Sequence, residues 1–273
     1  MKQLSPDLGI EIFYEWANPT YWDLALTEAF EGRAGKFSIH APYQGDIVEM
    51  SLTDKEDEMF AYLQEPFKLY HKFGGVGYVV HMNAPYAVAP TAAEKVDRLK
   101  RVEDRLAKLN DICVREGVNL LVENLAYGHG LKTLCDQQDF LSIFEHNKDL
   151  HCIVDTGHAI LGGIDIYEVQ KTLGDRLQAY HIHDNDGKED CHQRIQTGVI
   201  DWNRFAEGAR LYTPNAHCVL EYNATATKSF QDYKDDADAL RRLIEGLIQI
   251  NAARGSKQPR ADSFFMLSLR SAR

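Results

Sequence analysis

The chain alternates between short apolar runs, rich in β-branched residues, and longer segments in which apolar positions recur at helical spacing. The short runs predict β-strands. Several of them, such as LLVEN, CIVDTG and YVVHM, are apolar almost throughout, which is typical of parallel strands covered on both faces. The seven predicted strands span residues 9–15, 36–42, 77–84, 119–125, 151–157, 177–184 and 217–223.

Helical patterns fill the intervals between these strands, and two of them end at Gly117 and Gly174. The predicted helices span residues 53–72, 91–116, 139–147, 166–173, 202–209 and 229–253. Strand and helix alternate without a Pro/Gly/Ser-rich linker, which predicts one α/β domain over residues 1–253. An open dinucleotide-binding sheet would carry GxGxxG after its first strand, where this chain has WANPT. We therefore expect a TIM (β/α)8-type barrel.

The strand count is one short of the eight that a complete barrel requires. Because the first predicted strand already begins at Gly9, we expect the barrel to lack or shorten its first βα unit. Residues 254–273 lose the helical pattern and end in FFMLSLRSAR, which predicts a poorly ordered C-terminal extension. An open barrel edge would expose unpaired backbone groups and favour a homodimer.

Composition narrows the class of protein. The chain has 41 acidic and 30 basic residues, so its formal charge of −11 provides no general basic field for nucleic acid. The five cysteines form no CxxC pair, which argues against a disulfide framework and a zinc ribbon and fits a reducing compartment. No apolar run reaches the ~20 residues of a membrane span, and MKQLSPDLG lacks the apolar core of a signal peptide. We expect a soluble cytoplasmic protein without a membrane partner.

Ionisable side chains recur at or near the carboxyl ends of six of the seven predicted strands. They are His40, His81, Glu123, Asp155, His158, His181, His183, Asp190, His192 and Glu221. In a parallel barrel these ends converge on one mouth, where active sites of this architecture are built. Buried carboxylates need a counter-charge, and few Lys or Arg residues lie at these strand ends. Imidazoles mixed with carboxylates suit zinc, manganese, iron or cobalt better than calcium.

Each of these residues also has a purely structural interpretation. His40 or His81 could be a satisfied core histidine, and Glu123 or Asp155 could cap the following helix. Repetition of the pattern from strand to strand favours a common site over these separate explanations. Asp184 is expected to support a turn rather than to bind a ligand.

Seven motifs, taken in order, resemble the xylose isomerase-like TIM barrel superfamily, which includes sugar and sugar phosphate isomerases and epimerases, inosose-type enzymes and endonuclease IV of AP endonuclease family 2. The motifs are GIEIFYE, IHAPY, VEN, DTGH, HIHDNDG followed by DxH, GVIDW, and LEYN, and the resemblance covers roughly residues 9–250. The resemblance is carried by their order and context, because IHAPY or DTGH alone would be weak.

In the epimerases of this superfamily, Glu, Asp, His and Glu bind one divalent metal, which the resemblance assigns here to Glu123, Asp155, His181 and Glu221. Zinc, manganese, cobalt or iron would fit this set better than magnesium. The two glutamates would also act as acid and base, removing a proton from a carbon next to a carbonyl through a metal-stabilised enediolate. The implied substrate is a small polyhydroxy carbonyl compound, such as a sugar, a sugar phosphate or an inosose, of carbohydrate metabolism.

Three further residues are expected to contact this substrate. His158 would hydrogen-bond one of its oxygens, and Arg194 could grip a phosphate or carboxylate. His183 shares a strand face with His181, so it is either a substrate contact or the metal-binding histidine in place of His181. His181 is favoured because IHD follows it, as in the family.

Two alternatives remain open. An endonuclease IV-like enzyme, cleaving DNA at abasic sites, would use up to three zinc ions and would add His40, His81, His158, Asp190 and His192 as ligands. VENLAYG and LEYN, where that enzyme has Glu-Thr, and the acidic composition argue against it. The other alternative is a non-catalytic barrel that binds a metal or ligand. QTG at residues 196–198, where many relatives have Gly-Glu-Gly, leaves the substrate open.

Overall fold

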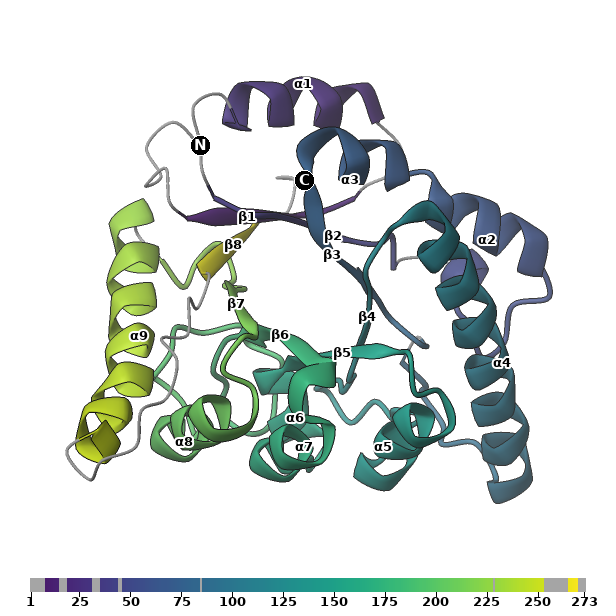
Figure 1. Cartoon of the computed structure of the whole chain (residues 1–273). Helices are drawn as coiled ribbons and strands as arrows, with labels where there is room; N and C mark the ends of the chain where they lie inside the picture. Colours follow the sequence, from purple (N-terminus) through teal and green to yellow (C-terminus); the bar gives the residue numbers. More distant parts are fainter. Residues whose placement is uncertain are drawn as a thin grey trace.

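Eight parallel strands close into a barrel in the computed structural model of the chain (Figure 1). The structure describes residues 8–14, 19–30, 35–43, 46–83, 85–227, 229–252 and 265–269. The strands follow one another around the barrel in chain order, which confirms the predicted TIM-type α/β fold. Their bounds are β1 Gly9–Phe13, β2 Phe37–His40, β3 Gly75–Val80, β4 Leu120–Glu123, β5 His151–Asp155, β6 Leu177–Ile182, β7 His217–Leu220 and β8 Phe265–Leu269.

The last strand, β8, was not predicted from the sequence. It pairs in parallel with β1, where Met266 lies opposite Gly9, and with β7, where Phe265 lies opposite Cys218. The first βα unit, expected to be absent or shortened, is present as β1 and the helix Pro19–Phe30, and the strand missing from the predicted count is the last one. The predicted C-terminal extension is wrong for Phe265–Leu269, whereas residues 254–264 and 270–273 lie outside the described residues.

The helices lie outside the ring of strands (Figure 1). They are α1 Pro19–Phe30, η1 Asp46–Val48, α2 Glu56–Gln64, α3 Phe67–Phe73, α4 Ala92–Glu116, α5 Gln137–His146, α6 Thr156–Leu161, α7 Ile166–Leu173, η2 Gly174–Arg176, α8 Trp202–Tyr212 and α9 Phe230–Ala252. No helix among the described residues is both long enough and apolar enough to cross a membrane. Glu15, Ala84 and Ala253, at which predicted elements ended, lie outside the described residues.

Local signals explain where several helices begin and end. Thr91 caps α4 in a reciprocal pair with Glu94, and Gly117 ends the same helix with a φ of 67°, a left-handed conformation that suits glycine. The single helix predicted over residues 53–72 is instead α2 and α3. The break occurs at Pro66, which has no backbone N–H with which to continue the hydrogen bonds of α2.

The barrel interior is layered from apolar to polar. Val79, Leu121, Ile153 and Ala179 form a separate buried cluster of side chains on β3, β4, β5 and β6. Two residues further along these strands, the inward positions change to ionisable side chains, as at Glu123. The apolar layer therefore forms a floor beneath the carboxyl-terminal mouth, which is where chemistry can be carried out in this architecture.

Candidate metal centre

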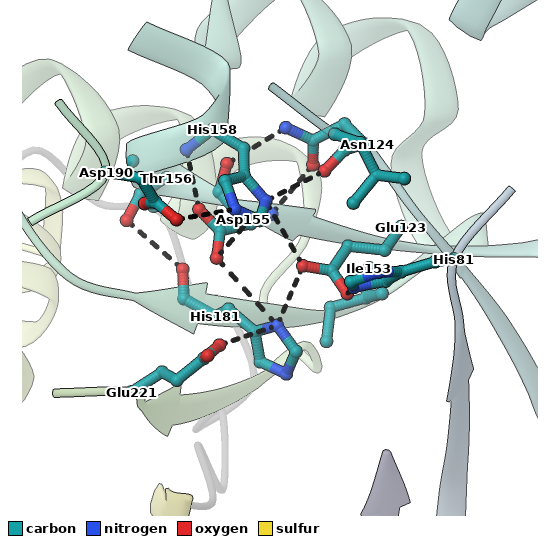
Figure 2. Close-up of polar contacts among 12 residues, drawn as sticks. His81, Glu123, Asn124, Ile153, Asp155, Thr156, His158, His181, Asp190 and Glu221 are labelled. Carbon is teal, nitrogen blue, oxygen red and sulfur yellow. Dashed lines mark hydrogen bonds and ion pairs between the residues drawn. The ribbon is translucent and has the colours of Figure 1, made fainter. Parts of the chain in front are cut away.

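The four ligands implied by the sequence lie together at the mouth of the barrel (Figure 2). Glu123 and Asp155 end β4 and β5, His181 lies in β6, and Glu221 follows β7 directly. Nδ1 of His181 is 3.1 Å from Oε1 of Glu123 and 3.1 Å from Oε2 of Glu221. The same nitrogen is 3.9 Å from Oδ2 of Asp155. All four side chains are buried, and these short distances make them a compact set of one imidazole and three carboxylates.

A second group flanks this centre on the side of β2 and β3. Nε2 of His40 and Nε2 of His81 lie 3.4 and 3.1 Å from Oε2 of Glu123. The Nδ1–H of His40 donates to the carbonyl oxygen of Ala41 at 2.8 Å, which leaves Nε2 of His40 with a lone pair. Glu123 therefore presents Oε1 to the central group and Oε2 to His40 and His81.

A third group lies on the other side, in the loop that follows β6. Oδ2 of Asp190 is 3.4 Å from Nε2 of His158 and 3.1 Å from Nε2 of His192. The Nδ1–H of His192 donates to the backbone oxygen of Glu221 at 3.0 Å, and its Nε2 faces Asp190, to which it donates in the absence of a metal. His158 also reaches the centre, because its Nδ1 is 3.4 Å from Oε1 of Glu123. All the additional ligands expected from the sequence thus lie beside the first four.

The charges of the histidines and of the carboxylates in the site stabilise one another. Burial alone would lower the pKa of His181, but the carboxylates of Glu123, Glu11 and Glu221 raise it well above its usual value. Burial would likewise raise the pKa of Glu123, yet the neighbouring His181 and His81 hold it well below the normal range. His158 also has a raised pKa, because Asp155, Asp190 and Glu123 outweigh its burial. Without a metal, protons on the histidines balance the carboxylates.

The donor set fits one or more divalent cations. The candidate ligand atoms lie within 4.8 Å of one another in each flanking group and, at the centre, among Glu123, Asp155 and His181. Within the described part of the chain, the buried Oδ1 of Asp190 accepts no hydrogen bond, and Oε2 of Glu123 has the contacts with His40 and His81 given above. Buried polar atoms are rarely left without a partner, and a cation would provide one. The mixture of nitrogen and oxygen donors suits zinc, manganese, iron or cobalt.

Backbone contacts fix the position of Asp155. Its Oδ1 accepts from the backbone N–H of His158 at 2.7 Å and so caps α6, while the carboxylate lies 2.9 Å from Nε2 of His183. The side-chain amide of Asn124 donates to the backbone oxygen of Asp155 at 3.0 Å and accepts from the backbone N–H of Asp155 at 2.7 Å. The carboxylate of Asp155 therefore caps a helix and also lies among the candidate ligands, so the two interpretations of this residue drawn from the sequence do not exclude each other.

His183 and Gly157 explain the close packing behind the site. His183 is fully buried and stacks on His192 with ring centroids 3.9 Å apart. A Cβ at Gly157 would lie 2.0 Å from Cε1 of His183, so this position requires glycine. Since His183 contacts the carboxylate of Asp155 rather than the shared position between Glu123 and Glu221, the geometry places His181 at the centre and His183 behind it.

The loop after β6 is held by Asp184 and Arg194. The carboxylate of Asp184 accepts from the indole N–H of Trp202 at 2.9 Å and from the backbone N–H of Ile200 at 3.2 Å, in agreement with its expected turn-supporting role. Arg194, expected to contact substrate, instead donates to Asp232 and Asp236 of α9 at distances of 2.7 to 2.9 Å. Its positive charge is thereby offset by two carboxylates.

Sequence reasoning missed two residues of the site. Asn124 follows Glu123 in VEN, and its pairing with Asp155 across β4 and β5 could have been suspected only from the motif. Glu11 lies within the apolar strand GIEIF, and its Oε1 is 2.7 Å from Nε2 of His181, 170 positions away in the chain. A single acidic residue in such a strand was the available signal.

Known proteins share the family and the fold of this chain. The model of the family described as xylose isomerase-like TIM barrel matches residues 9–243. The uncharacterized protein MJ1614 of Methanocaldococcus jannaschii is 25% identical over 214 residues, which cover 77% of this chain and 78% of that protein.

Solved structures share the fold at low sequence identity. A D-tagatose 3-epimerase-like protein superposes with a TM-score of 0.74 at 18% identity, covering 89% of this chain and 90% of the other. An L-ribulose 3-epimerase superposes with a TM-score of 0.72 at 16% identity, covering 92% and 89%. Together with the family match over most of its length, these findings show that the chain belongs to the xylose isomerase-like TIM barrel family.

Proposed function

We propose that the protein is a divalent-metal-dependent isomerase or epimerase of a sugar or related polyhydroxy carbonyl compound. The observation that carries this proposal is the position of Glu123 and Glu221, which approach Nδ1 of His181 from β4 and β7 at 3.1 Å each. Two carboxylates at one centre provide both a base and an acid for proton transfer. The epimerase named among the structural neighbours supports the same reaction class.

The residues of the chain divide the reaction between them. Glu123, Asp155, His181 and Glu221 would hold the metal, which supplies stabilisation for negative charge on substrate oxygens. One glutamate removes the proton from the carbon next to the carbonyl, and the other returns a proton to that carbon from the opposite face or to its neighbour. His158, 3.4 Å from Glu123, is placed to hydrogen-bond a substrate oxygen.

Solvent proton exchange tests this proposal. The metal-loaded protein is incubated in deuterated water with a panel of ketoses, ketose phosphates and inososes, and deuterium incorporation next to the carbonyl is followed by NMR. Glu123→Gln and Glu221→Gln should reduce exchange by about 100-fold or more, because general acid–base catalysis typically contributes 10²–10⁴-fold. Glu116→Gln, on the exposed end of α4, serves as the control.

Two results would count against this proposal. Retention of full exchange in both glutamine variants would remove the glutamates from the reaction. Tight metal binding without exchange on any member of the panel would favour the non-catalytic barrel for these substrates.

A second candidate is a phosphodiesterase of the endonuclease IV type. The observation that favours it is the presence of the two flanking groups, His40 with His81 and His158 with Asp190 and His192, on either side of the central ligands. Such a site could hold three cations around one phosphate, and neighbouring metal ions stabilise both the attacking and the leaving oxygen of a displacement.

Metal content separates the two candidates. Elemental analysis of the purified protein, before and after reconstitution, should give about one metal per chain for the isomerase. A value near three zinc ions, together with cleavage of an oligonucleotide that contains an abasic site, would establish the phosphodiesterase. His40→Ala and His192→Ala should lower the stoichiometry only in the second case.

A further inference from the structure

Glu11 is a buried carboxylate beneath the metal centre. It lies on β1 opposite Ser38 on β2, is 1% exposed, and accepts a hydrogen bond from the Ser38 hydroxyl at 2.6 Å through Oε2. It lines a small cavity in the barrel together with small or apolar side chains and, at the other end of the strands, the polar Asn119, Gln178 and His217. A carboxylate in such surroundings is costly unless it is paired.

The partner of Glu11 is the imidazole of His181. Oε1 of Glu11 lies 2.7 Å from Nε2 of His181, and the ring is fully buried. Because a carboxylate only accepts hydrogen bonds, Nε2 must carry the hydrogen. The opposite ring nitrogen, Nδ1, faces Glu123 and Glu221 (Figure 2). Without a metal, Nδ1 also carries a hydrogen, because it too faces carboxylates. A metal at the centre would replace the hydrogen on Nδ1, the nitrogen that faces the other ligands, and leave the hydrogen on Nε2 with Glu11.

We propose that Glu11 is a positioning residue that holds the Nε2–H of His181, so that His181 binds metal through Nδ1. This inference rests on the proposed function only in requiring a metal at the central group. It differs from the arrangement at His40, where Nδ1 donates to the Ala41 oxygen and Nε2 faces the ligands. The two histidines thus present different nitrogens, each selected by the hydrogen bond at the other side of the ring.

Metal affinity gives the first test. Zinc affinity is measured by competition with a chelator for the whole protein and for Glu11→Leu and Glu11→Gln. Glu11→Leu removes the acceptor and should weaken binding about 10- to 100-fold, as is typical for such outer contacts. Glu11→Gln keeps an acceptor for Nε2–H and should recover much of this loss. Equal affinity in all three proteins would overturn the proposal.

Glu49 provides a matched control for burying and neutralising a carboxylate. It is 6% exposed and accepts from the Ser51 hydroxyl at 2.7 Å, as Glu11 does from Ser38. The hydroxyls of Ser51 and Tyr86, from which its carboxylate accepts hydrogen bonds, do not belong to the candidate metal centre. Glu49→Gln should therefore bind zinc as the unmodified protein does. Loss of affinity in this variant equal to that in Glu11→Leu would reduce the effect to general destabilisation and overturn the proposal.

Nitrogen NMR gives a second test, in which the bound state is measured on the unmodified protein and a variant serves only to assign the signal. In zinc-loaded protein labelled with ¹⁵N-histidine, the resonance that disappears in His181→Gln should show zinc on Nδ1 and hydrogen on Nε2. Zinc on Nε2 of His181 would overturn the inference while leaving the metal-dependent function intact. A protein that binds no zinc, manganese, cobalt or iron would overturn both.

Discussion

At the scale of single residues, the site is a set of charges that compensate one another. His158 contacts three carboxylates, those of Glu123, Asp155 and Asp190. These contacts raise its pKa although burial opposes protonation. Protons and metal ions therefore compete for the same imidazoles, and each can stabilise the fold in the absence of the other.

This competition predicts how stability depends on pH. The pKa of a histidine in the unfolded chain is about 6.5. Because His158 and His181 have raised pKa values in the folded protein, the stabilisation by their protonation is fully present below about pH 6.5 and is lost as the pH rises through the folded values. The melting temperature of the metal-free protein should therefore fall on the alkaline side of neutrality, whereas saturating zinc should oppose this decline.

Scanning calorimetry between pH 6 and 9.5 measures the effect. His158→Gln should flatten the decline of the metal-free protein, while His146→Gln should leave it unchanged, because His146 is exposed and pairs only at the surface with Glu103. A metal-free protein that gains stability steadily over this interval would refute the interpretation.

The convergence of Glu123, Asp155, His181 and Glu221 could be predicted from the sequence, because each lies at or near the end of an apolar strand and the ends of parallel strands converge. Glu11 and Asn124 could not, since their roles depend on contacts across the barrel and not on their neighbours in the chain. The positive charge of Arg194 is evident from the sequence, but its ion pairs with Asp232 and Asp236 of α9 depend on the fold and could not be predicted.

At the scale of elements, the loop between β6 and α8 brings Asp190 and His192 to the site. The buried residue Asp184 anchors this loop at two points. Its backbone pairs with that of Gln193, and its carboxylate accepts hydrogen bonds from the backbone of Ile200 and the indole of Trp202. The loop is thus anchored to the barrel by hydrogen bonds that do not involve a metal.

Asp184→Asn should disturb this anchor. The amide would replace one acceptor oxygen by a donor and leave either the Trp202 indole N–H or the backbone donors without a partner, which costs about 1–3 kcal/mol. Urea unfolding measures the loss of stability. Asp201→Asn, which alters the capping residue of α8 but keeps a good cap, is the comparison and should change little. Equal stability of Asp184→Asn and the unmodified protein would contradict the assigned role.

Element boundaries were harder to predict than element types. The capped helices α4 and α7 lie where the pattern places them, whereas α2 and α3 are divided at Pro66. Strand β8 was missed because a run of five residues after a stretch without periodicity gives little signal before its partners are known. Its identity as a strand comes from pairing with β1 and β7.

At the scale of the molecule, β8 determines whether the sheet is closed. The expectation of a homodimer rested on an open edge, and β8 covers that edge by pairing with both β1 and β7. Oligomerisation itself stays a prediction. A chain ending at Ala252 would expose both edges and should self-associate or aggregate.

Light scattering after size-exclusion chromatography measures this change. The control is a chain that ends at Leu269 and retains β8. If the chain ending at Ala252 has the same mass and melting temperature as this control, β8 does not determine closure.

The order of strands along the chain also has a consequence for synthesis. Every ligand of the candidate metal centre lies between His40 and Glu221, whereas the strand that completes the ring comes later. A ribosome releases the chain from its N-terminal side, so all the candidate ligands leave the exit tunnel before β8. For the proposed metal site, this order means that the nascent protein has every candidate ligand before its sheet can close.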